Sequence, residues 1–199
     1  MSTPFVFSGQ VMVAILALTW TVAQSQSITG NSTGLLVKGL CPIVKLAKNF
    51  NTTSFAGSWY KVGGLPNYEE RAVNCTIYNY VDTGSGFFVE STGVARNGDS
   101  TIQNKTLVTV TPGIARYSTH VRDIEAEMVV LGTDFVTYTC LFTCYNFQGT
   151  HKVMFAWIYS RKSTLSRANI ALCQKHFVAV GVPVNNLRGT YQGPKCGHQ

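Results

Sequence analysis

The sequence predicts an all-β domain, an antiparallel meander of about eight strands that closes into a barrel or a sandwich. Three observations support this fold class. Only 13% of the 199 residues are charged while 12% are aromatic, and such a composition favours sheet over a helical bundle. From residue 57 onward, short β-like runs follow one another at regular spacing. Turn sequences such as Asn97-Gly98 and Pro112-Gly113 separate them, as in hairpins.

Each predicted strand is a stretch of β-branched and aromatic residues. The stretches are 59–65, 75–81, 87–95, 101–111, 115–121, 127–131, 135–147 and 152–160. One helix is predicted after the last strand, where Ser163 or Thr164 supplies the N-cap and apolar residues follow through Phe177. Gly181 and Pro183 end this helix.

The N-terminus is predicted to be a secretory signal peptide over residues 1–23. Its apolar run at 11–23 has the length of a signal core, whereas a membrane-spanning helix needs about 20 residues. The segment before it lacks Lys and Arg, which departs from the usual signal pattern, and an uncleaved membrane anchor is the alternative. We expect residues 24–39 to be flexible and residues 40–199 to form the folded domain of a secreted, extracellular protein.

Sequons and cysteines support export. The sequence Asn-x-Thr, which accepts N-glycans, occurs at Asn31, Asn51, Asn74 and Asn104. Six cysteines, an even number, favour three disulfides in an exported chain. A zinc site is the alternative, but such a site usually requires closely spaced cysteine pairs with histidine nearby.

The basic charge does not indicate a nucleic-acid partner. The formal net charge is +7, but the basic residues are scattered singly and the densest cluster is only Arg161-Lys162. We therefore expect a solvated basic surface, no nucleic acid and no stable insertion into a membrane.

Three motifs, in order along the chain, resemble the signature of the lipocalins. They are Gly57-Ser58-Trp59 on the first predicted strand, Thr133-Asp134-Phe135 in a turn, and Tyr159-Ser160-Arg161 before the helix. The resemblance covers roughly residues 40–197. It implies an eight-stranded antiparallel up-and-down barrel with one C-terminal α-helix packed outside. It also implies structural roles for Gly57, Trp59, Thr133, Asp134 and Arg161, with Trp59 and Arg161 packed together at the closed end.

Within that family the chain looks most similar to the apolipoprotein D and insect bilin-binding branch, and above all to the carotenoid-binding crustacyanins. The similarity lies in Leu40-Cys41-Pro42, in residues 88–98 and in residues 138–144. It implies disulfides Cys41–Cys144, Cys75–Cys196 and Cys140–Cys173. The implied ligand is a non-covalently bound carotenoid such as astaxanthin, or a biliverdin-type bilin. The resemblance also implies association in pairs, as a homodimer or with a related lipocalin.

The implied pairing fixes which side chains face the barrel interior. Side chains alternate along a strand, so Cys140 and Cys144 share one face. Bridges to an outer helix and to an N-terminal arm both require that face to point outward. Leu141, Thr143 and Tyr145 are then predicted to face the cavity.

Other strands supply the remaining candidate ligand contacts. Glycosylation at Asn104 would turn that residue outward and leave Gln103, Lys105 and Leu107 facing inward. Each candidate could instead be an ordinary core residue. The predicted contacts are Val153, Phe155 and Trp157 on the last strand, and Phe88, Glu90 and Thr92 on the third.

The sequence therefore favours a secreted carrier of a small hydrophobic ligand, with a pigment as the first candidate. One alternative is an enzyme that uses a free cavity thiol, but all six cysteines have implied partners. The four histidines also form no known catalytic motif, so we predict no catalysis. The other alternative is a storage or nutrient glycoprotein that binds fatty acid.

Overall fold

The computed structural model describes residues 34–44, 46, 49–121 and 124–197. The predicted signal peptide, residues 24–33 of the predicted flexible segment and the sequon at Asn31 lie outside the described residues.

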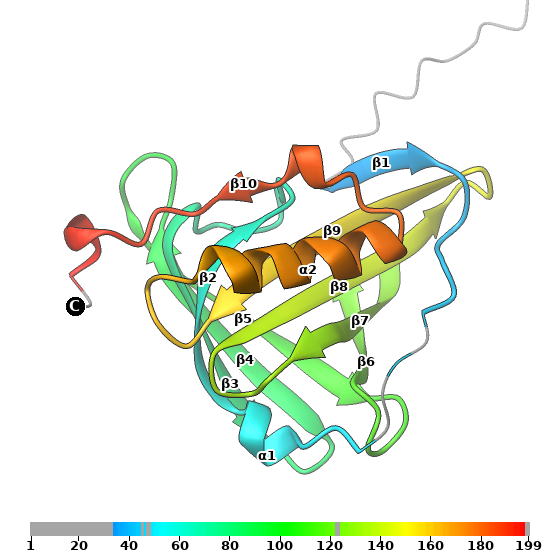
Figure 1. The fold of residues 1–199 in the computed structure, drawn as a ribbon, viewed down its shortest axis with the longest axis horizontal. Helices are drawn as coiled ribbons and strands as arrows, with labels where there is room; N and C mark the ends of the chain where they lie inside the picture. The colour runs from blue at the N-terminus through cyan, green and yellow to red at the C-terminus, as the bar shows by residue number, and fades with distance from the viewer. Residues whose placement is uncertain (1–33, 45, 47–48, 122–123, 198–199) are drawn as a thin grey trace, which may run out of the picture. The chain divides into compact units, whose positions relative to one another are not determined.

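The described chain forms a single sheet of ten strands together with short helices (Figure 1). The strands are β1 Leu35–Lys38, β2 Gly57–Gly64, β3 Asn74–Asp82, β4 Gly86–Val94, β5 Ser100–Thr109, β6 Arg116–Val121, β7 Ile124–Thr133, β8 Tyr138–Phe147, β9 His151–Ser160 and β10 Arg188–Gly189. The α-helices are α1 Thr52–Phe55 and α2 Arg167–Ala179, and two 3₁₀ turns are η1 Val184–Asn186 and η2 Pro194–Cys196.

Strands β2 to β9 close into an antiparallel barrel. Each pairs with the next along the chain, and β9 returns to pair with β2, so that Tyr60 lies opposite Ser160. Closure removes the free edges that an open sheet would expose. Figure 1 shows α2 lying across the outside of this barrel. The predicted eight-stranded up-and-down barrel with one outer helix is therefore confirmed.

The structure corrects three boundaries. Residues 35–38, predicted as part of a flexible segment, form β1, which pairs with β9 beginning at Leu35 opposite Met154. Strand β8 begins at Tyr138 rather than at 135, because three backbone N–H groups of the preceding turn donate to the Asp134 carboxylate. The N-cap of α2 is Ser166, not Ser163 or Thr164, since its side chain accepts a hydrogen bond from the Asn169 backbone.

Two apolar clusters lie on opposite faces of the barrel wall. The inner cluster is rich in aromatic residues and includes Phe55, Trp59 and Phe87, which are fully buried. The outer cluster packs α2 against the sheet through Phe177 and Phe142. Because inner and outer residues alternate along β8 and β9, both strands are buried on both faces.

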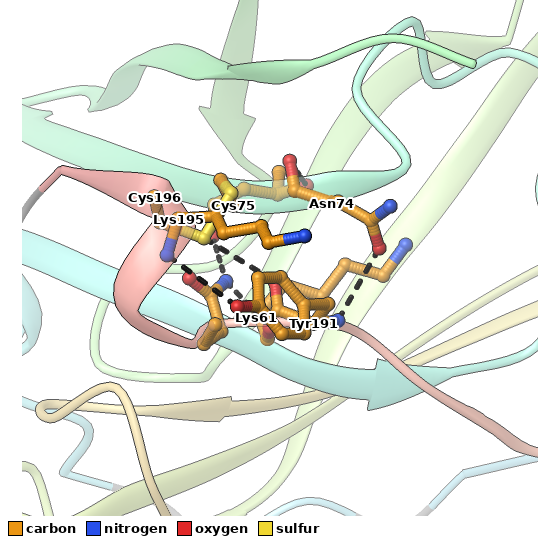
Figure 2. The surroundings of a disulfide bond; sticks show 8 residues. Lys61, Asn74, Cys75, Tyr191, Lys195 and Cys196 are labelled. Carbon is orange, nitrogen blue, oxygen red and sulfur yellow. Dashed lines mark hydrogen bonds between the residues drawn. A yellow bond between two sulfur atoms is a disulfide. The ribbon is translucent and has the colours of Figure 1, made fainter. Parts of the chain in front are cut away.

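The three disulfides have the implied pairing, which confirms that prediction. Cys41–Cys144 joins the segment after β1 to β8, and Cys140–Cys173 joins β8 to α2. Both bonds lie on the outer face, as the parity argument required. Figure 2 shows Cys75–Cys196, which ties the C-terminal segment to β3 beside Asn74 and Tyr191.

The closed end of the barrel is organised around Arg161. Its guanidinium carbon lies 3.7 Å from the centre of the Trp59 ring. Its nitrogens also donate to the backbone carbonyls of Ser54, Phe55, Ala56, Ser58 and Phe135. Arg161 thus joins α1, β2 and the β7–β8 turn, in agreement with a structural role for the two residues.

Candidate ligand cavity

A cavity of about 190 Å³ opens inside the barrel. It occupies only part of the interior, because aromatic side chains fill the closed end. Phe55 packs 5.4 Å from Trp59 and 5.6 Å from Phe87, measured between ring centres. Tyr78 stacks on Tyr159 at 4.8 Å between ring centres. The free space therefore lies beyond these rings, beside the loop that precedes β3 and the last residues of β6.

One side of the cavity is a flat aromatic wall. Phe155 and Trp157, two residues apart on β9, point the same way and lie almost parallel, with 5.9 Å between ring centres and 10° between planes. Val89 on β4 also lines the space. A planar, conjugated molecule can lie against such a surface with little loss of conformational entropy.

The cavity also contains a buried polar cluster centred on Glu70, in the loop between β2 and β3. The Glu70 carboxylate accepts hydrogen bonds from the Lys61 ammonium, the Tyr78 hydroxyl and the Trp157 indole, the last at 2.7 Å. The Lys61 and Glu70 side chains are only 9% and 12% exposed. Burial, followed by the Glu70 charge, raises the pKa of Tyr78 well above its usual value, so this hydroxyl remains a donor at neutral pH.

Lys105 on β5 is the second cation of the cavity wall. Its ammonium lies 5.5 Å from the centre of the Trp157 ring and 5.9 Å from that of Tyr78. Burial lowers the pKa of Lys105, the nearby Glu70 carboxylate acts against this, and Lys61 adds to the lowering. The cavity therefore combines an aromatic face with a charged group able to pair with an anion.

A second, more open hollow adjoins the mouth. It measures about 520 Å³ and lies between residues 67–73 and the β4–β5 hairpin. Asn67 and Glu70 line both spaces, so the two hollows lie next to each other at these residues. The Arg96 guanidinium lies over the Tyr68 ring, with 5.6 Å to its centre. The second hollow therefore offers additional space beside the mouth of the inner cavity.

The structure orients the predicted contacts on β8 and β9 inward. Thr143, Phe155 and Trp157 line the cavity. Leu141, Tyr145 and Val153 belong to the inner cluster and are buried. Whether these six residues contact a ligand stays a prediction.

The prediction for β4 is wrong. Phe88, Glu90 and Thr92 lie on the outer face, and Phe88 is 40% exposed. Their neighbours in the sequence, Val89 and Ser91, line the cavity instead. The reason is that Phe87, not Phe88, packs into the inner aromatic cluster. Because side chains alternate between the two faces of a strand, the inward orientation of Phe87 also turns Val89 and Ser91 inward. The inward orientation expected for Gln103, Lys105 and Leu107 on β5 agrees with the structure.

The sequence did not predict Glu70 as a cavity residue. It lies in a loop, where no periodicity shows which way a side chain points. The available signal was the adjacent acidic pair Glu69-Glu70, which follows β2 in a chain with only 9 acidic residues. Lys61, its partner, sits on β2 in the inward phase set by Trp59.

The sequon asparagines within the described residues are all exposed. Asn51 caps α1, Asn74 lies beside the Cys75–Cys196 disulfide and Asn104 lies on β5. Their exposure is compatible with N-glycans at each position, which stay predicted.

The motif residues have structural roles. The Thr133 hydroxyl accepts from the Phe135 backbone and donates to the Tyr138 carbonyl, which closes the β7–β8 turn. Gly57 has φ +94°, a left-handed conformation that favours glycine, and an added Cβ would meet the Arg161 guanidinium at 3.4 Å. The glycine therefore shapes the closed end directly beside Arg161.

The barrel, its outer helix and the interior cavity match a known protein family. The family model of the lipocalin and cytosolic fatty-acid binding protein family matches residues 56–193. The chain is a lipocalin. Members of this family are generally carriers of small ligands.

Curated relatives of this lipocalin come from crustaceans, insects and mammals. The crustacyanin-A1 subunit of Homarus gammarus is 28% identical over 147 residues, which cover 73% of this chain and 81% of that protein. Insecticyanin-B of Manduca sexta is 29% identical, covering 64% and 66% of the two chains. Mouse apolipoprotein D is 23% identical, covering 92% and 94%.

Solved structures of crustacyanins have the same fold as this lipocalin. Apocrustacyanin C2 superimposes on this lipocalin with a TM-score of 0.73 and 27% identity, covering 80% of this chain and 92% of that one. For H1 crustacyanin from the lobster Homarus americanus the TM-score is 0.71 at 26% identity, with the same coverage.

The described part of the lipocalin has neither a candidate membrane span nor a candidate metal site. It contains no helix that is both long and apolar enough to span a membrane. The same residues include no group of three or more His, Cys, Asp or Glu side chains arranged to hold a metal ion.

Proposed function

We propose that this lipocalin is a secreted carrier that binds a pigment, a carotenoid or a bilin, with one end of the molecule inside the barrel. The observation that supports this most is the parallel Phe155–Trp157 wall facing the cavity. A rigid conjugated system gains apolar burial and ring contact there. Resemblance to crustacyanin points to a carotenoid, and resemblance to insecticyanin points to a bilin.

The size of the cavity determines how such a ligand would sit. Ligand pockets usually measure about 300–1,000 Å³, whereas the inner cavity has about 190 Å³. A pigment would therefore place only part of its length against Trp157. The rest would follow the rim hollow past Asn67 or contact a second lipocalin chain, since the resemblance also implies association in pairs.

A titration with matched variants on β4 tests this proposal. Ser91 lines the cavity and Thr92, beside it, points outward. Ser91→Phe should fill the inner space and weaken pigment binding by at least about tenfold, a loss of about 1.4 kcal/mol. Thr92→Phe should leave the affinity within about twofold, because its added ring lies outside.

Quenching of tryptophan fluorescence by astaxanthin and by biliverdin, together with the visible spectrum of each complex, gives the affinities. Native protein should also be coloured, and an organic extract should yield the pigment by mass spectrometry. A colourless native protein that yields only fatty acid, and whose wild-type form binds neither pigment, would overturn the pigment proposal. That result would support the storage alternative instead.

A further inference from the structure

Lys105 is a half-buried cation on the cavity wall, and no described residue serves as its polar partner. It forms no ion pair or hydrogen bond with any described residue, and its contacts are with the faces of the Trp157 and Tyr78 rings. An ammonium group that is partly withdrawn from water loses free energy of hydration unless a counter-charge or a hydrogen-bond acceptor compensates it. Ring faces supply only part of that compensation.

The Glu70 carboxylate, whose charge acts on Lys105, already accepts three other hydrogen bonds. One Glu70 oxygen accepts from Lys61, and the other accepts from Tyr78 and Trp157. Turning Glu70 toward Lys105 would leave Lys61 unpaired, and Lys61 is also buried. The Lys61–Glu70 pair is neutral as a unit, so a positive charge is left over at Lys105.

Among the described residues, the charged groups that act on Lys105 are Glu70 and Lys61. Glu69, a second described acidic residue, lines the same cavity but is not one of these two groups. Thr119 and Thr143, only 6% and 2% exposed, add two hydroxyl groups to the cavity wall. These hydroxyls can donate to an oxygen anion that enters the space.

We propose that the cavity selects ligands that carry a carboxylate, and that this group pairs with Lys105 while the apolar body lies against Phe155 and Trp157. The inference rests on the proposed function and narrows it. A biliverdin-type bilin carries propionate carboxylates, whereas astaxanthin ends in keto and hydroxyl groups. The cavity thus favours the bilin over the carotenoid as the inner ligand.

Two pairs of acid and ester isolate the carboxylate from the rest of the ligand. The probes are biliverdin with its dimethyl ester, and retinoic acid with methyl retinoate. Wild-type protein should bind the acid of at least one pair about tenfold or more tightly than the ester, because a hydrogen bond between charged groups is stronger than a neutral one. Tryptophan quenching at pH 7 measures all four affinities.

Variants at position 105 test whether Lys105 binds the carboxylate of the ligand. Lys105→Met keeps the length and the apolar stem, and should reduce the acid's affinity to about that of the ester. Lys105→Arg keeps the charge and should preserve a preference of severalfold. Lys162→Met, at an exposed lysine beside the closed end, is the matched control and should behave as wild type.

The outcomes separate this inference from the proposed function. Equal affinity for acid and ester in wild type, or an unchanged preference in Lys105→Met, would overturn the role of Lys105. Tight binding of astaxanthin with no binding of either acid would also overturn the role of Lys105, but it would agree with the proposal that the protein carries a pigment. Failure to bind all four probes and astaxanthin would instead remove the proposed function itself.

Discussion

Glu70 joins three parts of the barrel through one carboxylate. It connects its own loop to Lys61 on β2, Tyr78 on β3 and Trp157 on β9. A buried ion pair contributes little net stability when compared with apolar residues, but removing one partner leaves an uncompensated charge. The loop at the mouth of the cavity is therefore held in place by electrostatics as well as by packing.

Replacing one partner of this pair should cost more than replacing both. Glu70→Gln keeps an acceptor for Tyr78 but leaves Lys61 charged and buried, so we expect a loss of about 3 kcal/mol in the free energy of unfolding. Lys61→Met alone should also destabilise. The double variant should be less destabilised than the sum of the two, as urea unfolding of all four proteins would reveal. Additive losses would mean that the pair is not coupled.

Asp134 is expected to make the stability of the fold depend on pH. Its partial burial acts to raise the pKa, but backbone N–H donors from Tyr138, Thr137 and Val136 outweigh this and lower it. A carboxyl whose pKa is lower in the folded state stabilises the fold above its unfolded pKa of about 3.9. That contribution is lost as the pH falls through the folded value.

Asp134→Asn should therefore destabilise the protein at pH 7 by roughly 0.5–1 kcal/mol, a value kept small because the side chain is exposed to solvent. The difference between wild type and variant should shrink as the pH is lowered from 5 to about 2. Urea unfolding across that range measures it. A difference that stays constant with pH would contradict the charge argument and point to geometry alone.

At the scale of elements, β8 could be oriented from the sequence and β4 could not. Two cysteines on β8 had implied partners outside the barrel, which fixed the parity of the whole strand. On β4 the adjacent residues Phe87 and Phe88 point to opposite faces of the strand. Each face therefore has an aromatic residue, and the sequence pattern does not show which face points inward. Strand β1 was missed for a related reason, because four residues are too few for a periodic signal.

The helix α2 depends on its bond to β8. Cys140–Cys173 spans 33 residues, so replacing both cysteines by alanine should destabilise the fold by about 2–4 kcal/mol, mainly by freeing the unfolded chain. Ligand affinity should change little, because this bond lies on the face opposite the cavity. Thermal unfolding and a biliverdin titration of the same variant measure both effects. A large loss of affinity with the barrel still folded would show that α2 shapes the cavity.

At the scale of the whole molecule, the barrel divides its interior between stability and binding. The closed end is filled by aromatic rings and by Arg161, features that the family motifs make predictable. The upper part keeps a small space lined by residues from several strands and from the loop that carries Glu70. That space could not be foreseen in detail, because loop side chains have no periodic rule and a cavity volume depends on how every ring packs.

Because the ligand is proposed to bind inside the folded barrel, its binding should raise the free energy of unfolding. A molecule that binds the folded barrel alone adds RT ln(1 + [L]/Kd), about 2.7 kcal/mol at a hundredfold excess over Kd. For a domain of this size that corresponds to a rise in Tm of roughly 5–10 °C. Wild type and Thr92→Phe should both show the rise with biliverdin, and Ser91→Phe should not at the same concentration, because its ring occupies the inner space. Equal shifts in all three proteins would place the ligand outside the barrel, where filling the cavity has no effect.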